Sequence, residues 1–220
     1  MIVAIDGPAG AGKSTVARIL AKRLGFLYID TGAMYRALTF KALENNIDIS
    51  DESKIHELAL KTNIDMRNNA DGSLSVFLDG RDVSLDIRKP AITQFVSDVS
   101  KIKGVRQVLV KLQRELGQRG DCVLEGRDIG TVVFPHAQKK FFIDASAQVR
   151  INRRFKELKG LNQDIAENDV AKDLSNRDKI DSTREISPLR KAEDAVYIDT
   201  TELSIEGVVD KMLKNCKLNG

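Results

Sequence analysis

Nine consecutive residues near the N-terminus have the types and the spacing of a phosphate-binding loop. They are Gly7, Pro8, Ala9, Gly10, Ala11, Gly12, Lys13, Ser14 and Thr15, and they fit the pattern G-x-x-x-x-G-K-[ST] in full. Glycines let a backbone wrap closely around a phosphate, and the N–H groups of the loop then point inward as donors. In this pattern a solvent-facing Lys13 reaches the β- and γ-phosphates, and the Ser14 hydroxyl ligates Mg²⁺. The stretch predicts a site for Mg²⁺ and a nucleoside triphosphate.

The segments on either side of this loop support the interpretation. Met1–Ile5 is an apolar run that indicates a buried strand. A helical pattern follows, with an apolar face made by Val16, Ile19, Leu20 and Leu24. The positive N-terminal end of such a helix favours bound phosphate. The alternatives are a plain glycine-rich turn and a dinucleotide-binding G-x-G-x-x-G motif, and the second fails because its third glycine would fall at Thr15.

Further polar side chains follow two other buried runs. Tyr35 and Arg36 lie in a helix that comes after Phe26–Ile29. Glu125–Thr131 is a charged, glycine-flanked loop directly after Cys122–Leu124. Because parallel α/β sheets bind ligands at the carboxyl ends of their strands, both segments are placed for a second substrate. The alternative is a packed tyrosine and solvated charges.

Two polar helices carry rows of charge, the first with Arg150, Arg153 and Arg154 and the second with Arg177, Asp181 and Arg184. The members of each row are one or two helical turns apart, so they share a face. Above a phosphate loop, the first row predicts a lid that brings cations to a transferring phosphoryl group. A solvated face and a ladder of ion pairs are the respective alternatives.

A parallel sheet is needed to bring these residues together. Buried runs predict its five strands at residues 1–5, 26–29, 122–124, 140–144 and 196–199. The segments between them predict helices on both faces, with Asp51 as a cap, Pro90 in a first turn and an interruption at Gly104. The predicted fold class is α/β, of the P-loop NTPase type.

Short alternating runs within residues 63–84 predict a small antiparallel β-hairpin sheet inserted into this core. The turn pairs Asp71-Gly72 and Asp79-Gly80 separate the runs. We therefore expect a single domain over residues 1–220. Its expected parts are a core at about 1–62, 85–149 and 190–220, an insert at about 63–84 and a helical lid at about 150–185.

Composition excludes several other classes of protein. The chain has 220 residues, 42% of them hydrophobic, and a net charge of +3, so neither a nucleic-acid nor a membrane partner is indicated. Cys122 and Cys216 lack C-x-x-C spacing, and His56 and His136 are too far apart to indicate a metal site. With no predicted signal peptide or membrane-length apolar run, we expect a cytoplasmic protein. Nothing indicates an obligate apolar interface, so the expected state is a monomer.

Four stretches together resemble the bacterial cytidylate (CMP) kinases: Gly7–Thr15, Asp30–Arg36, Gly126–Pro135 and Arg177–Leu189. Their order and spacing cover nearly the whole chain, and the last three are far more specific than the phosphate loop. The hairpin insert also resembles the enlarged nucleotide-monophosphate domain of this family. The resemblance implies a transferase of pyrimidine metabolism that converts ATP and CMP or dCMP into ADP and CDP or dCDP.

The resemblance also implies which residues bind the acceptor nucleotide. The residues implied for the cytosine base are Ser97, Arg106 and Asp128, whose groups suit an amine donor and two acceptors. Arg36 and Arg127 are implied for the phosphate, which arginine binds bidentately. Those implied for the sugar are Arg177, Asp181 and Arg184, with Thr31 and Tyr35 completing the acceptor side. Some relatives carry Ser where Thr31 stands, and the hydroxyl is kept.

The expected chemistry is positioning and neutralisation of charge, with no covalent enzyme intermediate. The implied catalytic cations are Lys13, Arg127, Arg177 and Arg184, and Arg153 is the lid arginine expected to contact ATP. The attacking phosphate oxygen is already anionic, so no strong general base is needed. Closure of the lid and insert is expected to exclude water.

Two other functions are alternatives to the hypothesis of a cytidylate kinase. A kinase for UMP, AMP or shikimate would share the phosphate loop, although Asp128 disfavours uracil, which has an acceptor where cytosine has its amine. A GTPase-like switch or regulatory ATP-binding module would have no use for so many arginines, and the guanine-reading Asn-Lys-x-Asp stretch is absent. The CMP to dCMP preference, the tolerance for UMP and any regulation stay open.

Overall fold

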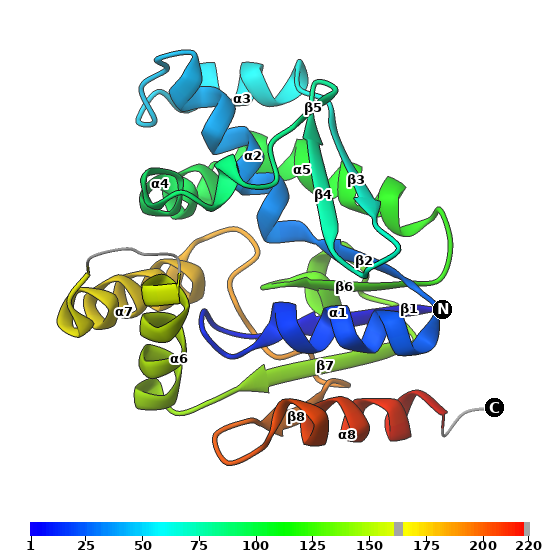
Figure 1. Cartoon of the computed structure of the whole chain (residues 1–220). Helices are drawn as coiled ribbons and strands as arrows, with labels where there is room; N and C mark the ends of the chain where they lie inside the picture. Colours follow the sequence, from blue (N-terminus) through cyan, green and yellow to red (C-terminus); the bar gives the residue numbers. More distant parts are fainter. Residues whose placement is uncertain (161–164, 218–220) are drawn as a thin grey trace.

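The computed structural model describes residues 1–160 and 165–217 around a central five-stranded parallel sheet (Figure 1). Its strands are β1 (Ile2–Asp6), β2 (Leu27–Asp30), β6 (Cys122–Gly126), β7 (Lys139–Asp144) and β8 (Val196–Asp199). They follow the order β2-β6-β1-β7-β8, and every pair is parallel. The predicted sheet and the α/β class are confirmed. β1 and β2 end one residue later than predicted and β6 two residues later, which carries polar residues to the carboxyl ends of the strands.

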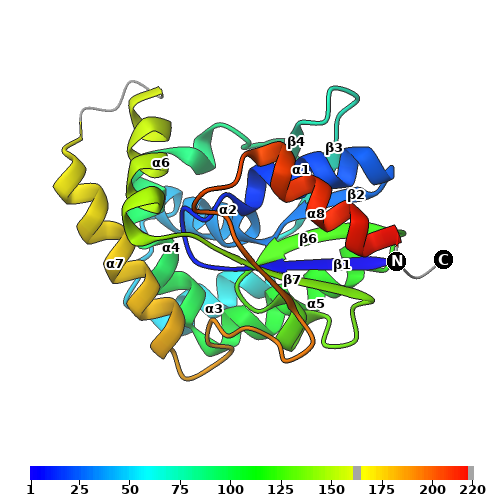
Figure 2. The ribbon, with the colours of Figure 1, turned by 90° about the horizontal axis from the view of Figure 1, so that it is seen from below.

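Helices cover both faces of this sheet, as predicted (Figure 2). Two of them pack on one face: α1 (Lys13–Leu24) and α8 (Ile205–Lys217). Four belong to the core of the other face: α2 (Thr31–Glu44), α3 (Glu52–Leu60), α4 (Pro90–Lys101) and α5 (Lys103–Gly117). Neighbouring strand residues point to opposite faces, so Val3 belongs to the first core and Ala4 to the second.

The predicted insert is a three-stranded antiparallel sheet of β3 (Ile64–Asn68), β4 (Leu74–Leu78) and β5 (Arg81–Asp82). Gly72 and Gly80 both have a φ of 86°, which glycine adopts without strain. A short 3₁₀ turn, η1 (Asp86–Arg88), leads on to α4. The side chain of Asn68 bonds both backbone groups of Tyr28, at 3.0 and 3.1 Å. This pairing fixes the insert to the edge strand β2.

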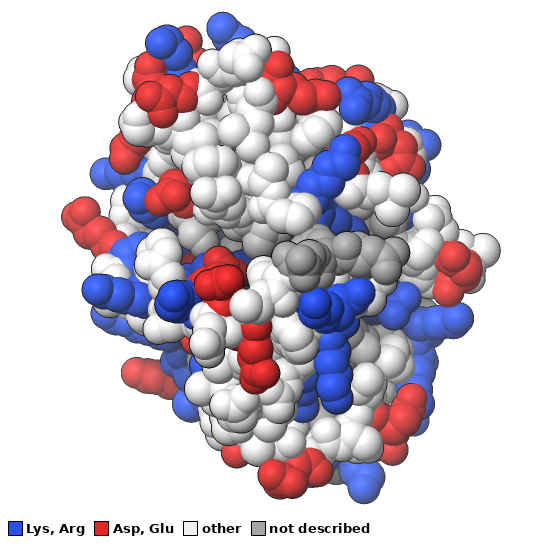
Figure 3. All heavy atoms as spheres, turned by 60° about the vertical axis from the view of Figure 1, so that its left-hand side comes forward, with Lys and Arg blue, Asp and Glu red and all other residues white. Residues whose placement is uncertain are grey.

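Two further helices, α6 (Ala147–Gly160) and α7 (Glu167–Thr183), lie beyond the carboxyl end of the sheet (Figures 1 and 2). Leu158, Val170 and Leu174 form a small core that includes Ala9 of the phosphate loop. On the face that carries these helices, Lys and Arg side chains are interspersed with Asp and Glu (Figure 3). Within the described ranges, no helix has the length and apolarity needed to cross a membrane.

Two details of the predicted helices are wrong. The break between α4 and α5 is at Ile102, whose ψ of 120° is extended, and Gly104 is helical. A Cβ on Gly104 would lie 2.5 Å from Cγ of His56, so this glycine allows α5 to approach α3. Arg184 lies just beyond the end of α7, also with an extended ψ of 140°, and is not part of its helical face. The second polar helix is predicted over residues 162–185, and its residues 162–164 lie outside the described residues.

Candidate active site

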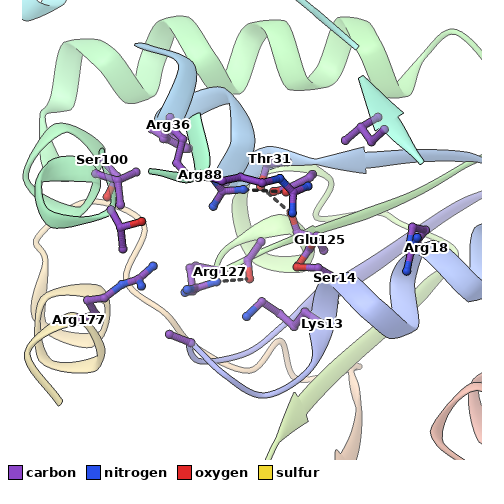
Figure 4. Close-up of a pocket in the computed structure, with 18 of the residues that line it drawn as sticks. Lys13, Ser14, Arg18, Thr31, Arg36, Arg88, Ser100, Glu125, Arg127 and Arg177 are labelled. Atoms are coloured by element: carbon purple, nitrogen blue, oxygen red, sulfur yellow. Dashed lines mark hydrogen bonds and ion pairs between the residues drawn. The ribbon is translucent and has the colours of Figure 1, made fainter. Parts of the chain in front are cut away.

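A cavity of about 1050 Å³ opens at the carboxyl ends of β1, β2 and β6. Its walls come from the phosphate loop, α2, the insert, α4, α5, β6, α6 and α7. Lys13 extends from the loop towards Arg127, while Arg177 reaches in from α7 and Arg36 from α2 (Figure 4). The cavity therefore joins the predicted triphosphate site to the predicted acceptor site.

The phosphate loop has the expected connection to α1. Gly12 precedes the helix with a φ of 92°, and a Cβ on Gly7 would lie 2.0 Å from the carbonyl oxygen of Ile143. Gly7 is thus required by the approach of β7. The expectation that Lys13 faces solvent is wrong, because its side chain is buried. Lys13 is only 6% exposed, and its Nζ donates to the carbonyl oxygen of Pro8 at 2.7 Å.

Burial has the largest influence on the pKa of the Lys13 ammonium. Together with the positive charge of Arg127, it lowers the pKa of Lys13 to about 7, against the opposing effect of Glu125. A bound anion would favour the charged ammonium and replace the carbonyl oxygen of Pro8 as its partner. The site therefore stabilises a cation at this position best when a phosphate is present.

Glu125 is a residue that the sequence reasoning did not assign. It lies at the carboxyl end of β6 and is 4% exposed, and it lines the cavity. Tyr28 donates its hydroxyl to Oε1 at 2.6 Å, and the side chain of Ser14 lies beside Glu125 (Figure 4). Burial raises the pKa of the Glu125 carboxyl. The signal in the sequence is a carboxylate that ends a buried strand just before a glycine.

Hard oxygen donors at this point fit Mg²⁺. The Ser14 hydroxyl and the Glu125 carboxylate meet beside Lys13, and magnesium binds through one or two such groups plus water and substrate phosphates. Over the described ranges, no group of three or more His, Cys, Asp or Glu side chains could hold a metal by itself. The donor set therefore suits an ion that arrives with a polyphosphate.

Each arginine implied for the acceptor phosphate is held by an aspartate. Arg36 donates to Oδ2 of Asp30 at 2.8 Å, and Oδ1 of Asp30 accepts the N–H of Ala33 as the cap of α2. Arg127 donates its Nε to Oδ2 of Asp181 at 2.7 Å. Both arginines line the cavity. Their orientation is therefore set before any ligand binds.

The residues implied for the base form a buried ionic network. Arg106 donates to Oδ2 of Asp128, while a nitrogen of Arg184 is 3.6 Å from Oδ1. The guanidinium of Arg106 lies 5.5 Å from the centre of the Tyr35 ring. Ser97 lines the same part of the cavity. This set offers hydrogen-bonding groups of both kinds to a flat polar ring.

Arg177 and Asp181 project from α7 into the cavity, as predicted. Arg184 also lines it from beyond the helix, where its Nε donates to the carbonyl oxygen of Ser187 at 2.7 Å. Burial and the nearby Arg127 lower the pKa of Arg177 to about 10. Nε of Arg177 has no hydrogen-bond partner in the part of the chain that the structure describes. An anionic ligand would supply one.

The lid arginines have different positions. Arg153, expected to contact ATP, does not line the cavity and is bonded to Thr200, with Nη2 donating to the carbonyl oxygen at 2.8 Å. Its Nη1 also reaches the carbonyl oxygen of Ala11 at 3.4 Å. Arg154 does line the cavity, and its Nε is buried without a partner among the described residues. The geometry thus favours Arg154 over Arg153 as the contact for a phosphate.

Most of the predicted residues lie in one place. Those that line the cavity are Ala9, Gly10, Lys13, Ser14, Thr15, Thr31, Tyr35, Arg36, Ser97, Arg106, Arg127, Asp128, Arg177, Asp181 and Arg184. Those that do not are Gly7, Pro8, Ala11, Gly12 and Arg153. Additional cations on its walls are Arg18, Arg88 and Arg154. Arg18 could have been found from its position one turn after Ser14 on the same helix face.

Comparisons with known proteins find cytidylate kinases that are similar to this chain over nearly its whole length. A family model described as cytidylate kinase matches residues 3–218. A cytidylate kinase from Caldanaerobacter subterraneus subsp. tengcongensis is 52% identical over 99% of this chain and 95% of the relative. One from Bacillus subtilis is 49% identical over 96% and 94%. A solved structure of an uncharacterized protein from Eubacterium ventriosum has a TM-score of 0.50 at 13% identity, covering 100% of this chain and 99% of that one, which shows the fold alone.

Proposed function

The chain belongs to the cytidylate kinase family, and we propose that it transfers the γ-phosphoryl group of ATP to CMP and dCMP. The products are then ADP and CDP or dCDP. One observation carries this proposal: a continuous cavity joins Lys13 and Ser14 to the buried pair of Arg106 and Asp128. A triphosphate at one end and a polar base at the other would both find complementary groups.

On the donor side, the loop N–H groups, the N-terminal end of α1 and Lys13 are proposed to bind the ATP phosphates. Ser14 and Glu125 would hold Mg²⁺, which, when bound, neutralises phosphate charge and helps to orient the γ-phosphoryl group. Arg154 is the lid residue that we propose to contact the transferring group. Arg153 is proposed to fix α6 to the loop through Thr200.

On the acceptor side, Asp128 and Ser97 are proposed to accept from the cytosine N4 amine, while Arg106 donates to N3 and O2. Arg36 and Arg127 would bind the phosphate of CMP. The residues proposed for the sugar are Arg177, Asp181 and Arg184, with Thr31 and Tyr35 forming the remaining wall. Thr31 donates its hydroxyl to the carbonyl oxygen of Glu125 at 2.6 Å, and this hydrogen bond fixes the orientation of the Thr31 side chain in the cavity wall.

The transfer itself needs little from side-chain acids or bases. An oxygen of the CMP phosphate attacks the γ-phosphorus in line, and the bond from that phosphorus to the β–γ bridging oxygen breaks to release ADP. The positive charges of Lys13, Arg127, Arg177 and Arg184 favour the negative charge on the γ-phosphoryl oxygens. Closure of the lid and insert over both substrates is part of the proposal, since water would otherwise compete as acceptor.

A cytoplasmic location belongs to the same proposal, and the two free cysteines, Cys122 and Cys216, agree with a reducing compartment. A monomeric state stays a prediction that sedimentation would test. The reaction is tested by incubating the protein with Mg²⁺, CMP and ATP labelled at the γ-phosphate. Label that appears in CDP supports the proposal. Label that appears only in inorganic phosphate, at a rate independent of CMP, would contradict it.

A further inference from the structure

The residue that faces the base, Asp128, lies directly before a single π-helical turn, η2 (Ile129–Val133). The first N–H groups of a helical turn have no partner within it, and an aspartate just before the turn commonly caps them with its own side chain. Asp128 makes no such side-chain cap. Its carboxylate points into the cavity instead, towards Arg106 and Arg184.

Another aspartate caps this turn. Asp6, the last residue of β1, accepts the N–H of Ile129 on Oδ1 and the N–H of Gly130 on Oδ2, each at 2.8 Å. Asp6 is 4% exposed and does not line the cavity, so it has no direct route to a ligand. It is more than 120 residues away from its partners in the sequence.

We propose that Asp6 is a positioning residue for base selection, because it caps η2 in place of Asp128 and so leaves the Asp128 carboxylate free to face cytosine. The inference rests on the proposed function of Asp128. If the N–H groups of Ile129 and Gly130 lacked this partner, the side chain of Asp128 would be the nearest replacement, as the residue before the turn. A carboxylate that turns back to cap its own turn would no longer point into the cavity, where the base is proposed to bind.

The surroundings of Asp6 agree with a role other than simple stabilisation. Burial raises the pKa of this carboxyl to about 6, against the lowering effect of its two backbone donors. The negative charge of Asp128 also raises the pKa of Asp6, and the positive charge of Lys13 lowers it. Because Gly7 follows Asp6 directly, the cap also fixes η2 to the start of the phosphate loop. The Asp6 carboxylate is costly to ionise because it is buried. Its position next to the phosphate loop and its bonds to η2 connect the triphosphate part of the site to the acceptor part.

The test compares kcat and KM for CMP and UMP in Asp6→Asn and in the wild type. An amide keeps one acceptor but turns an N–H₂ group towards the second backbone donor. We expect the ratio of kcat/KM for CMP over UMP to fall about tenfold, mainly through a higher KM for CMP. The matched control is Asp51→Asn, which alters the exposed cap of α3 (Asp51 accepts from the N–H of Lys54 at 3.0 Å) and should leave the ratio unchanged.

The double variant Asp6→Asn/Asp128→Asn makes the test specific. If Asp6 acts through Asp128, then Asp6→Asn lowers the ratio no further once Asp128 is replaced. An equal loss in both backgrounds, or an unchanged ratio in Asp6→Asn, overturns the inference. If instead Asp128→Asn alone leaves the ratio unchanged, the proposed base recognition is what has failed.

A second variant covers the case in which Asp6→Asn does not fold. Asp6→Glu keeps the negative charge but adds a methylene group at a position that is only 4% exposed, so its carboxylate cannot keep both backbone bonds in their present geometry. The inference predicts a fall in the CMP over UMP ratio in the same direction as in Asp6→Asn. Full discrimination in Asp6→Glu would contradict it.

Discussion

Asp181 of α7 and Arg127, which directly follows β6, are joined by a hydrogen bond from Nε of Arg127 to Oδ2 of Asp181, 2.7 Å long. The bond links the polar helix to the carboxyl end of β6. Because Nε of Arg127 is bonded to Asp181, that nitrogen is not available to a phosphate at the same time. Nη1 of Arg127 also donates to the carbonyl oxygen of Gly126, at 3.3 Å. Arg127 is therefore oriented by the protein before its ligand arrives.

Replacing Arg127 by lysine should separate charge from geometry. A single ammonium cannot serve Asp181 and bind a phosphate in the bidentate way of a guanidinium. We expect Arg127→Lys to raise the KM for CMP by about tenfold or more, with a smaller change in the KM for ATP. Initial rates at varied CMP and ATP give both values. Arg119→Lys is the control, because Arg119 pairs with Asp65 and does not line the cavity.

The two neighbouring lid arginines should respond differently to the same change. Arg154→Gln removes a charge from the cavity wall, so we expect kcat to fall about tenfold or more with a near-normal unfolding temperature. Arg153→Gln removes the bonds to Thr200 and Ala11, so we expect a loss of about 1 kcal/mol in the free energy of unfolding and a smaller loss of kcat. A larger loss of kcat in Arg153→Gln than in Arg154→Gln would instead support Arg153 as the residue that contacts ATP.

Lys13→Met tests the electrostatic role of the phosphate loop. Methionine keeps the apolar stem in its buried position but removes the cation, and the loss of one such group lowers kcat by about 10²–10³. Product formation from ATP and CMP measures this loss. Lys22→Met, at an exposed lysine of the same helix, is the control. Near-normal turnover in Lys13→Met would be incompatible with the proposed mechanism.

The carboxyl of Asp6 gives a pH dependence of stability with a defined sign. Its pKa is about 6 in the folded chain, whereas an aspartate in an unfolded chain has a pKa near 3.9. The folded state thus binds the proton more tightly, and its stability decreases as the pH rises from about 4 to about 6. Relative to Asp6→Asn, the free energy of unfolding of the wild type should decline by about 2 kcal/mol between pH 4 and pH 6. Urea unfolding at several pH values measures this difference, which would stay constant if Asp6 titrated normally.

Local sequence signals were sufficient for much of the fold. The phosphate loop, the cap at Asp51, and Pro90 at the first turn of α4 depend only on neighbouring residues, and each has the predicted place. Burial of Cys122 followed from its position in an apolar run. The five parallel strands were found because residues buried on both faces form continuous apolar segments.

What the sequence did not provide depends on contacts between distant segments. The caps that Asp6 provides for Ile129 and Gly130 cross more than 120 residues, and the bond from Tyr28 to Glu125 crosses 97. Neither has a local pattern. The burial of Lys13 and the contact of Arg153 with Thr200 likewise need the packed fold. The division into core, insert and lid, and the roles of the individual site residues, stay predictions.

The central claim is that one cavity combines ATP with a cytosine nucleotide for phosphoryl transfer. The most direct measurement is the rate of ADP release from Mg·ATP with CMP, dCMP, UMP, AMP, shikimate or no acceptor. The account predicts fast release with CMP and dCMP, much slower release with the other acceptors, and almost none without an acceptor. Equal or faster release with UMP, AMP or shikimate would contradict the assignment of Asp128, Arg106 and Ser97 to the base. Release that is independent of every acceptor would contradict the proposed reaction itself.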